Sequence, residues 1–546
     1  MYRFADLHCH PTFYAFNRMR HTPGLAEDPE LYHPWHELPS NINKMNQGTR
    51  AMEYAQSNFA RLTEGGVRLV FASFTPIEKG FFVGNITRKE TDFTTELLSL
   101  VSGYTFAKSA RRLIEGGPPA AAREATRILR NRGPFRQLLQ SFVLKYSLPR
   151  VRHILSPQYD YWDELVSEYA FIKSRDGVRM EVEVDLGDGK REVEGCYHVI
   201  RTGDQLASVM EESDRDTAVI LTIEGAHVFS IGPDQHPVSE ELMFSRIAEM
   251  KNWQHPILFI TLAHHFDNGL CGHAHSLVDA ATLVMDQRLR LHEDFERRDD
   301  LGLRVVRELL DIDENLKDGN GRRIFIDVRH MSPRTRKSYY AEIVEPYNKA
   351  KKNKKSRPKI PVVMSHCGYA GVATLDEMIE NGPREDDHWH QNPFYAWGIN
   401  LSDEDVRIIH DSEGLIGLCF DQRVAGLPPA QKLGPENQPR LLINQIFGVV
   451  DVIMQDDRLP VAEKIKVWDR VCIGSDYDGV IDPISAYPTA VAFPRFADDL
   501  HQALERHRHT RLIAEIGVEA LVEKICWRNA YEFALDHMPA ACGEAR

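Results

Sequence analysis

Eight short runs of β-branched, aromatic and other apolar residues recur along the chain, separated by long amphipathic segments. The runs are "YRFADLHCH", "VRLVFASF", "AVILTIEGAH", "PILFITLAHH", "RIFIDVRH", "IPVVMSHCG", "GLIGLCFDQR" and "RVCIGSDYDG". Continuously apolar strands that alternate with helices are typical of a parallel sheet covered on both faces. Eight such units predict an α/β fold with a closed (β/α)8 TIM-type barrel.

Six of the eight runs end in histidine or an acidic residue. In a barrel of this kind the carboxyl ends of the strands form the active face, so these side chains are expected to converge. They are His8, His10, Glu224, His264, His330, His366 and Asp476. Imidazole and carboxylate donors without a matching thiolate favour zinc, with manganese, cobalt or iron as alternatives.

Each of these residues also has a simpler interpretation. Glu224 could cap the turn before Gly225, His264 could bond to loop backbone, and Asp476 could cap a helix. Convergence of all of them on one face favours the metal site.

The cysteines indicate a reducing compartment. Eight are spread over 546 residues with no C-x-x-C pair, which predicts free thiols in a cytoplasmic protein. Four of them, Cys9, Cys367, Cys419 and Cys472, lie within or beside the apolar runs and are expected to pack in the core. A nucleophilic pairing of Cys9 or Cys367 with a histidine stays open.

Charge and hydropathy exclude several classes of protein. The net charge of -14 argues against a general nucleic-acid binder. The sequence has no apolar stretch near 18 residues and no signal-peptide pattern at its start, so no transmembrane segment is expected.

In order and context, several segments resemble the renal or membrane dipeptidases, peptidase family M19 of the amidohydrolase superfamily. "ILTIEGAHVFS" resembles the E-G-G-H turn of that family, "FITLAHHFDN" its L-T-L-T-H segment, and "IDVRHMS" its D-x-S-H-v-S segment. "PVVMSHCG", "NLSDEDVRII" and "IGSDYDGV" resemble later motifs, and "LVEKICWRNAYEFA" retains the family asparagine as Asn529. The resemblance covers most of residues 1–76 and 216–535.

The resemblance implies roles for the residues at the strand ends. His8 and His10 would bind one divalent metal ion, His330 and His366 a second, and Glu224 both. His264 would stabilise the oxyanion, and Asp476, itself one of the expected metal-binding residues, would handle the proton of a metal-bridging hydroxide. The expected activity is hydrolysis of an amide or peptide bond in a small, dipeptide-like substrate.

Two positions depart from the family pattern. The family's first motif is H-x-D, whereas this chain has His8-Cys9-His10. The family also has an arginine before the asparagine of "R-N-l-x-D", where it holds the substrate carboxylate, but Ile399 stands there. An apolar side chain cannot replace a guanidinium clamp, so another arginine would be needed. The candidate substrate-binding residues are His227, Asn268, Arg329, Asn400 and Arg423.

The chain is longer than a (β/α)8 barrel requires. The expected organisation is barrel in residues 1–78 and 216–535, an insertion over 79–215, and a tail over 536–546. In the insertion, residues 80–155 are arginine-rich with helical spacing, and "VRMEVEVDLGDGKREVEGCYHVI" predicts a β-hairpin. The basic helices could face solvent, an anionic lipid, a nucleic acid or a partner subunit.

Two loops beside the later strands are also long. "KAKKNKKSRPKIP" is expected to be a solvated loop on the barrel face away from the site. "EMIENGPREDDHWHQNPFYAWGIN" follows His366 and could form a lid through His388, Trp389, His390 and Trp397, or pack on a neighbouring subunit. A homodimer is expected.

Other functions stay open at this level. The same barrel and metal pair could serve an N-acyl amino acid hydrolase, a lactonase or a deaminase. A catalytically reduced barrel that acts as a binding or scaffold protein is a further alternative. Retention of Asp476 and His264 favours a hydrolase, because a structural metal site needs neither.

Overall fold

The computed structural model describes most of the barrel and part of the insertion. Its described residues are 2–38, 54–81, 146–229, 238–277, 287–296, 300–351, 358–381, 394–426, 438–506, 513 and 515–540. Most of the arginine-rich stretch, residues 352–357 of the lysine-rich loop, and His388, Trp389 and His390 of the predicted lid therefore lie outside the described residues.

All eight predicted strands are present and parallel. They are β1 (Phe4–Cys9), β2 (Val67–Phe74), β6 (Thr217–Glu224), β7 (Ile257–Thr261), β8 (Phe325–Asp327), β9 (Val363–Cys367), β10 (Leu415–Leu418) and β11 (Val471–Ile473). They pair in the order β1-β2-β6-β7-β8-β9-β10-β11. The barrel closes where the amide of His10 donates to the carbonyl of Tyr477 over 2.9 Å. The predicted (β/α)8 barrel is confirmed.

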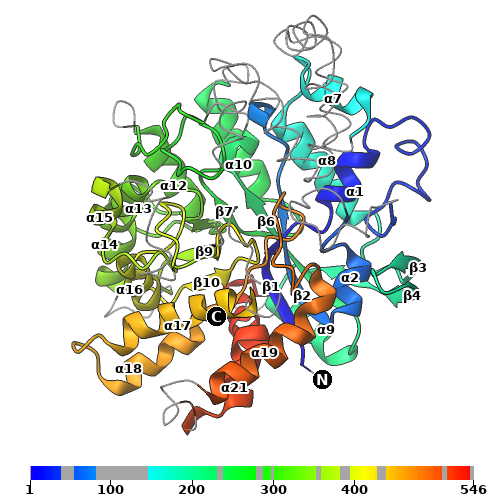
Figure 1. Ribbon diagram of the computed structural model, residues 1–546. Coiled ribbons are helices and arrows are strands. Elements are labelled where there is room, and N and C mark those ends of the chain that lie inside the picture. The colour runs from blue at the N-terminus through cyan, green and yellow to red at the C-terminus, as the bar shows by residue number, and fades with distance from the viewer. Residues whose placement is uncertain are drawn as a thin grey trace, which may run out of the picture.

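The strands have unbroken apolar sequences because both of their faces are buried inside the protein. Every residue of β1, β2 and β6 is buried. Helices surround the strands in Figure 1, with α10 and α12 to α17 on one side and α19 and α21 below. A single large apolar core joins the strands to these helices.

The helices of the described chain follow the strands in sequence. They are α1 (Phe13–Met19), α2 (Phe59–Glu64), α7 (Leu148–Ile154), α8 (Tyr161–Lys173), α9 (Gly203–Glu212), α10 (Glu240–Lys251), α12 (Leu301–Leu310), α13 (Pro333–Tyr339), α14 (Glu345–Lys351), α15 (Leu375–Asn381), α16 (Asp403–Asp411), α17 (Gln438–Met454), α18 (Val461–Ile465), α19 (Phe493–Glu505), α21 (Val518–Glu523) and α22 (Asn529–His537).

Local sequence determines where α13 begins, just after the turn that follows β8 and carries His330. The hydroxyl of Ser332 accepts a hydrogen bond from the amide of Thr335 over 3.0 Å, and Pro333 occupies the first helical turn. Ser at the N-cap and Pro at the next position are the preferred residues for a helix start. The helix therefore starts within three residues of His330 and limits the freedom of that loop.

The described part of the insertion contains α7, α8 and the predicted hairpin. Strands β3 (Met180–Asp185) and β4 (Lys190–Gly195) pair antiparallel, and the hairpin projects at the right edge of Figure 1. The rest of the predicted hairpin segment behaves differently. Residues Tyr197–Val199 form β5, which pairs in parallel with the first residues of β6 and so extends the barrel sheet.

The last helices are tied to the barrel by Asn529. Its side-chain amide donates to the carbonyls of Trp468 and Val471 over 2.7 and 2.8 Å. Val471 is the first residue of β11, so this asparagine anchors α22 against the last barrel strand.

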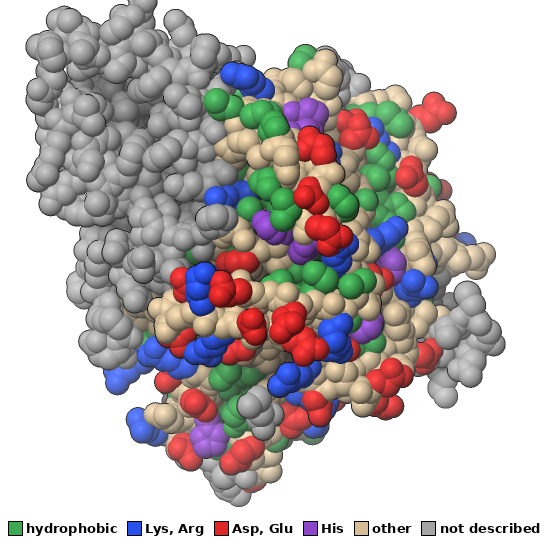
Figure 2. Space-filling model, turned by 90° about the vertical axis from the view of Figure 1, so that its right-hand side faces the viewer, with side chains coloured by type: hydrophobic (Ala, Val, Ile, Leu, Met, Phe, Trp, Pro, Cys, Tyr) green, Lys and Arg blue, Asp and Glu red, His purple; other side chains and the backbone are tan. Residues whose placement is uncertain are grey.

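Among the described residues, no helix is both long enough and apolar enough to cross a lipid bilayer. Figure 2 shows acidic and basic side chains interspersed on the face that it presents.

Candidate metal centre

The two histidines of the first strand point at one another. Their Nε2 atoms lie 3.2 Å apart, and both rings are buried. Nδ1 of His10 lies 2.9 Å from the carbonyl oxygen of Ser73, to which it can donate. A bond from the far ring nitrogen to a backbone carbonyl is the usual way in which a protein orients a metal-binding imidazole. Nε2 of His10 is thus directed to the centre.

Glu224, the last residue of β6, lies between two groups of histidines. Its Oε1 is 3.2 Å from Nε2 of His330 and 3.4 Å from Nε2 of His366. Its Oε2 is 3.3 Å from Nε2 of His10. The donors therefore form two clusters, one with His8, His10, Glu224 and Asp476 and one with Glu224, His330 and His366, that share this carboxylate.

Asp476 approaches the same centre from the end of β11. Its Oδ1 lies 3.7 Å from Nε2 of His8 and 3.5 Å from Nε2 of His10. Its Oδ2 lies 3.8 Å from Nε2 of His366. Asp476 thus faces both histidine groups.

The backbone is strained at two of these residues. His330 has φ +64° and Asp476 has φ +61°, which is the left-handed region that residues other than glycine rarely adopt. Such strain persists only where the surrounding structure enforces it, and it often lies at functional sites. In both cases it occurs three residues beyond the end of a barrel strand, at a residue whose side chain is directed to the centre.

His264 is held by a carboxylate that sequence analysis missed. Nδ1 of His264 lies 2.6 Å from Oε1 of Glu78, and its Nε2 lies 3.4 Å from Oε2 of Glu224. Glu78 follows β2, one of the two runs that do not end in a predicted histidine or acidic site residue. A sequence pattern could have found it only as an acidic residue a few positions beyond the strand end.

The carboxylates set the charge of two imidazoles. Burial alone would lower the pKa of His264, but Glu224 and Glu78 raise it to about 10. Burial likewise opposes the charge on His10, whereas Asp476 and Glu224 raise its pKa to about 10. Binding of a metal ion by His10 would therefore have to displace its proton. His264 is therefore an imidazolium at neutral pH, which is a strong hydrogen-bond donor.

The remaining members of the cluster titrate differently. Burial lowers the pKa of His330 to about 3 and that of His366 well below its usual value. Both are neutral at pH 7, the form that binds metal ions. Burial raises the pKa of Asp476, as does the nearby charge of Glu224. The pKa of Glu224 is held well below its ordinary value because the surrounding imidazoles, His264 foremost, outweigh its burial.

The donor set fits divalent cations. Nε2 of His366 is buried, faces two carboxylates and has no hydrogen-bond partner within the described residues. A buried polar atom without a partner is costly, and a metal ion would satisfy it. Four imidazoles with two carboxylates suit zinc or a similar ion, and Glu224 would be the shared ligand.

Of the known proteins compared with this chain, only solved structures are similar to it. No family model and no curated protein matches the chain. The chain is similar to the dipeptidase AC, described as a metallopeptidase of family M19, with 12% identity over 98% of both chains and a TM-score of 0.44. It is similar to a metallopeptidase from Rhodobacter sphaeroides liganded with a phosphinate mimic of L-Ala-D-Ala, with 13% identity over 98% of this chain and 99% of that chain and a TM-score of 0.44.

A third similar structure is the probable dipeptidase PvdM from Pseudomonas aeruginosa, with 11% identity over 92% of this chain and 93% of that chain and a TM-score of 0.37. These structures include the family that the sequence motifs resemble. At such identities and TM-scores, the function of this chain has to be inferred from its own side chains.

The predicted substrate-binding residues have mostly structural partners. Asn268 donates to the carbonyl of Leu262, and Asn400 donates to the carbonyls of Tyr395 and Val424. Nε2 of His227 lies 2.8 Å from the carbonyl of Pro76. The substrate contact expected of Asn268, Asn400 and His227 stays a prediction.

His227 contributes to the site in another way. Its ring stacks on that of His264 at an interplanar angle of 14°. The turn before it needs glycine, because Gly225 has φ +97° and a Cβ there would lie 2.2 Å from Nδ1 of His227. This turn lies directly after Glu224 and directs His227 toward His264.

The two candidate arginines differ in their surroundings. Arg423 forms an ion pair with Asp421 through its Nε and Nη2 atoms. Arg329 is buried, and its Nη1 donates to the carbonyl of Ile399 over 2.9 Å. Its Nε has no hydrogen-bond partner within the described residues. From the loop after β8, Arg329 thus reaches the backbone of Ile399.

Trp397 of the predicted lid lies inside the molecule. It is 5% exposed and packs in a small apolar cluster with Ile399, Cys419 and Val424.

The cysteines within the described residues are all buried and free, as expected. Cys9 and Cys367 have pKa values raised by burial, which disfavours the thiolate that a nucleophile requires.

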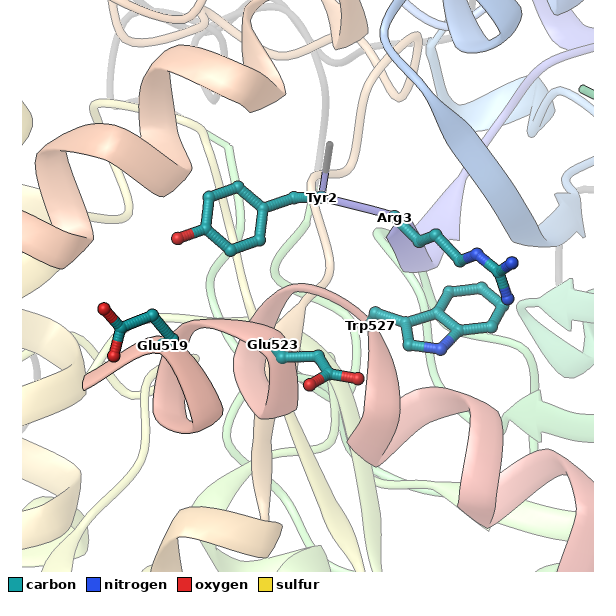
Figure 3. A pocket seen from close by; sticks show the side chains of 5 residues that line it. All are labelled: Tyr2, Arg3, Glu519, Glu523 and Trp527. Atoms are coloured by element: carbon teal, nitrogen blue, oxygen red, sulfur yellow. The ribbon is translucent and has the colours of Figure 1, made fainter. Parts of the chain in front are cut away.

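A surface pocket lies at the other end of the barrel. Tyr2, Arg3, Glu519, Glu523 and Trp527 line it, as Figure 3 shows. Tyr2 and Arg3 precede β1, whereas the histidine cluster follows that strand. This pocket is therefore separate from the candidate metal centre.

Proposed function

We propose that this protein is a binuclear metal-dependent hydrolase that cleaves an amide bond in a small, dipeptide-like substrate. The observation that carries the proposal is the position of Glu224, whose carboxylate oxygens lie 3.2 to 3.6 Å from the Nε2 atoms of both histidine groups. A carboxylate so placed is a natural shared ligand for two cations.

In this proposal His8 and His10 would hold one zinc ion, and His330 and His366 would hold the other. When bound, the metal pair would supply a water molecule of lowered pKa that is nucleophilic at neutral pH. The protein has to supply the remaining functions: proton transfer, stabilisation of the developing oxyanion, and substrate binding.

Asp476 is proposed to transfer the proton. It faces both histidine groups, and its raised pKa makes it a better proton acceptor than an ordinary aspartate. It would take the proton of the attacking water and deliver it to the departing amine. Amide hydrolysis needs the second transfer because an amide anion is a poor leaving group.

His264 is proposed to stabilise the oxyanion. Glu78 forms an ion pair with its Nδ1 over 2.6 Å and, with Glu224, keeps it protonated. Its Nε2 then points to the centre, where negative charge develops on the carbonyl oxygen during attack. A preorganised charged donor at such a position contributes about 3 kcal/mol to lowering the barrier.

Arg329 is proposed to bind the substrate carboxylate. In the family that the motifs resemble, this role belongs to an arginine at the position of Ile399. It is the arginine that reaches the Ile399 backbone, and it comes from the residue beside His330. Because Nη1 is engaged with Ile399, Nε and Nη2 are the nitrogens that would contact the carboxylate.

The test combines metal analysis with a substrate screen. We expect about two equivalents of divalent metal whose retention depends on Glu224, and metal-dependent hydrolysis of dipeptides. The screen should pair free with blocked carboxyl termini and include D-residues, N-acyl amino acids and lactones. A chelated preparation that hydrolyses all of its substrates as well as the metal-loaded protein would exclude the proposal.

A second candidate is a related hydrolase whose substrate has no free carboxylate. The apolar cluster around Ile399 and the pairing of Arg423 with Asp421 favour it. Faster hydrolysis of substrates with blocked carboxyl termini in the same screen would favour this second candidate. The cytoplasmic location and the homodimer expected from the sequence stay predictions.

A further inference from the structure

A second cluster of metal-binding residue types lies far from the candidate centre. Cys196, His198 and Asp216 place their Sγ, imidazole and carboxylate donor atoms within 4.8 Å of one another. Asp216 precedes β6, whereas Glu224 ends it. At about 3.3 Å per residue along a strand, the two sites lie roughly 25 Å apart.

The pairing of β5 with β6 brings the three residues together. Tyr197 pairs with Thr217, so Cys196 lies beside Asp216, and the amide of Thr217 donates to the carbonyl of Cys196 over 2.9 Å. Side chains alternate along a strand, so Cys196 and His198 share one face. The intervening Tyr197 points to the other face and stacks on Phe59. The cluster is therefore built on packed backbone.

The donor atoms meet at a single ring nitrogen. Sγ of Cys196 lies 3.6 Å and Oδ2 of Asp216 lies 3.5 Å from Nε2 of His198. In a Cys-His-Asp catalytic triad, the thiol and the carboxylate would contact opposite ring nitrogens. Convergence of both on Nε2 instead indicates a shared cation.

The distances match a tetrahedral zinc site. Zinc binds Cys, His and Asp donors at about 2.0–2.3 Å, which places neighbouring donor atoms about 3.3–3.8 Å apart in a tetrahedron. Both observed distances lie in this range. The imidazole is 30% exposed, so water can reach a fourth position.

The surroundings suit such an ion. Arg179 binds Oδ1 of Asp216 over 2.9 Å and leaves Oδ2 directed to His198. Carboxylates that bind metals are commonly oriented in this way by a hydrogen bond to the second oxygen. A zinc ion with one thiolate and one carboxylate is neutral overall, so the nearby guanidinium carries little penalty.

We propose that Cys196, His198 and Asp216 form a third zinc site, with water in its fourth position, which fastens β5 and the β3–β4 hairpin to β6. The hairpin ends at Gly195, directly before Cys196. The ion would thus tie the described part of the insertion to the barrel at the end opposite to the catalytic residues.

Cobalt substitution of the full-length protein tests this site apart from the binuclear centre. Thiolate bound to Co²⁺ gives an intense near-ultraviolet charge-transfer band, and the proposed binuclear centre contains no thiolate. We expect this band on titration with Co²⁺, its loss in Cys196→Ser, and its retention in Cys526→Ser, where another buried thiol is changed. No band, or an unchanged band in Cys196→Ser, would overturn the proposal.

Zinc content and stability supply a second test. Zinc-loaded wild type should hold about one equivalent more than Cys196→Ser or His198→Gln, with metal-dependent hydrolysis unchanged. His198→Gln alters a partly exposed side chain, so it keeps the test valid if Cys196→Ser misfolds. Zinc should raise the thermal midpoint of the wild type more than that of either variant. If the wild type, Cys196→Ser and His198→Gln hold equal amounts of zinc and show equal zinc-induced shifts in thermal midpoint, the third zinc site is refuted. This conclusion holds whatever the outcome for the binuclear centre.

Discussion

The backbone amide of Asp476 donates a hydrogen bond to the carbonyl of His8 over 2.8 Å. This bond joins the segment after the last strand to the first strand. The barrel therefore closes at two of the residues that we propose to act in catalysis. A change in this seam would move a candidate metal ligand and the candidate proton carrier together.

Replacing Glu224 with Gln should abolish metal binding at the centre. The amide removes the negative charge that both histidine groups face, so affinity should fall by more than about 100-fold. Elemental analysis and activity after dialysis measure the effect. Glu183→Gln, on the exposed hairpin, is the control and should retain both. Full retention of metal and activity by Glu224→Gln would contradict the shared-ligand role.

Replacing Asp476 with Asn should separate proton transfer from metal binding. We expect kcat to fall about 10²- to 10⁴-fold while about two equivalents of metal remain at the centre. The amide keeps the shape of the side chain but cannot carry the proton. Loss of metal in parallel with activity would indicate that Asp476 acts as a ligand instead.

Replacing Glu78 with Gln should lower the pKa of His264, because one of the two carboxylates that raise it to about 10 is removed. His264 donates only when protonated, so the alkaline limb of the kcat/KM profile should move to lower pH. Glu78→Asp keeps the charge and should shift the limb less. An identical profile in the wild type and Glu78→Gln would show that Glu78 does not act through His264.

Replacing Arg329 with Met should affect only substrates with a free carboxylate. The loss of a charged hydrogen bond of about 1.5–3 kcal/mol predicts a 10- to 100-fold rise in KM for dipeptides. Hydrolysis of blocked amides by the same variant serves as the internal control for folding. A similar loss on free and blocked substrates would indicate a structural role for this arginine.

Glu168 should make stability depend on pH. Burial in α8 raises its pKa to about 7, although the hydroxyl of Thr12 donates to it over 2.7 Å. A raised carboxyl pKa contributes stability that is full below the unfolded value and is lost as the pH rises through 7. Glu168→Gln should therefore gain thermal stability relative to the wild type between pH 5 and pH 8. The gain should be on the order of 2 kcal/mol, and a flat difference would contradict it.

The barrel and the members of the cluster could be predicted because both follow from chain geometry. Unbroken apolar runs indicate strands covered on both faces, and parallel strands bring their carboxyl ends to one face. His330 and His366 could thus be placed beside Glu224 from their positions after strands. Their roles as ligands stay predictions.

The partners of individual side chains could not be predicted in the same way. Glu78 lies in a loop, and its contact with His264 depends on the path of that loop. Arg423 pairs with an aspartate two residues earlier, and Asn400 bonds to backbone from two loops. Such pairings depend on rotamers and loop positions, which leave no periodic pattern in the sequence. The parallel pairing of β5 was missed because its residues continue the alternation of the hairpin.

The bond between His8 and Asp476 has a consequence for the order of assembly. The two residues are far apart in the sequence, so the barrel closes only after strands from distant segments have paired. Contacts of this kind form slowly, because a long loop must close before they contribute stability. The proposed cage should therefore be among the last parts of the molecule to assemble, and loading with metal should follow folding of the barrel.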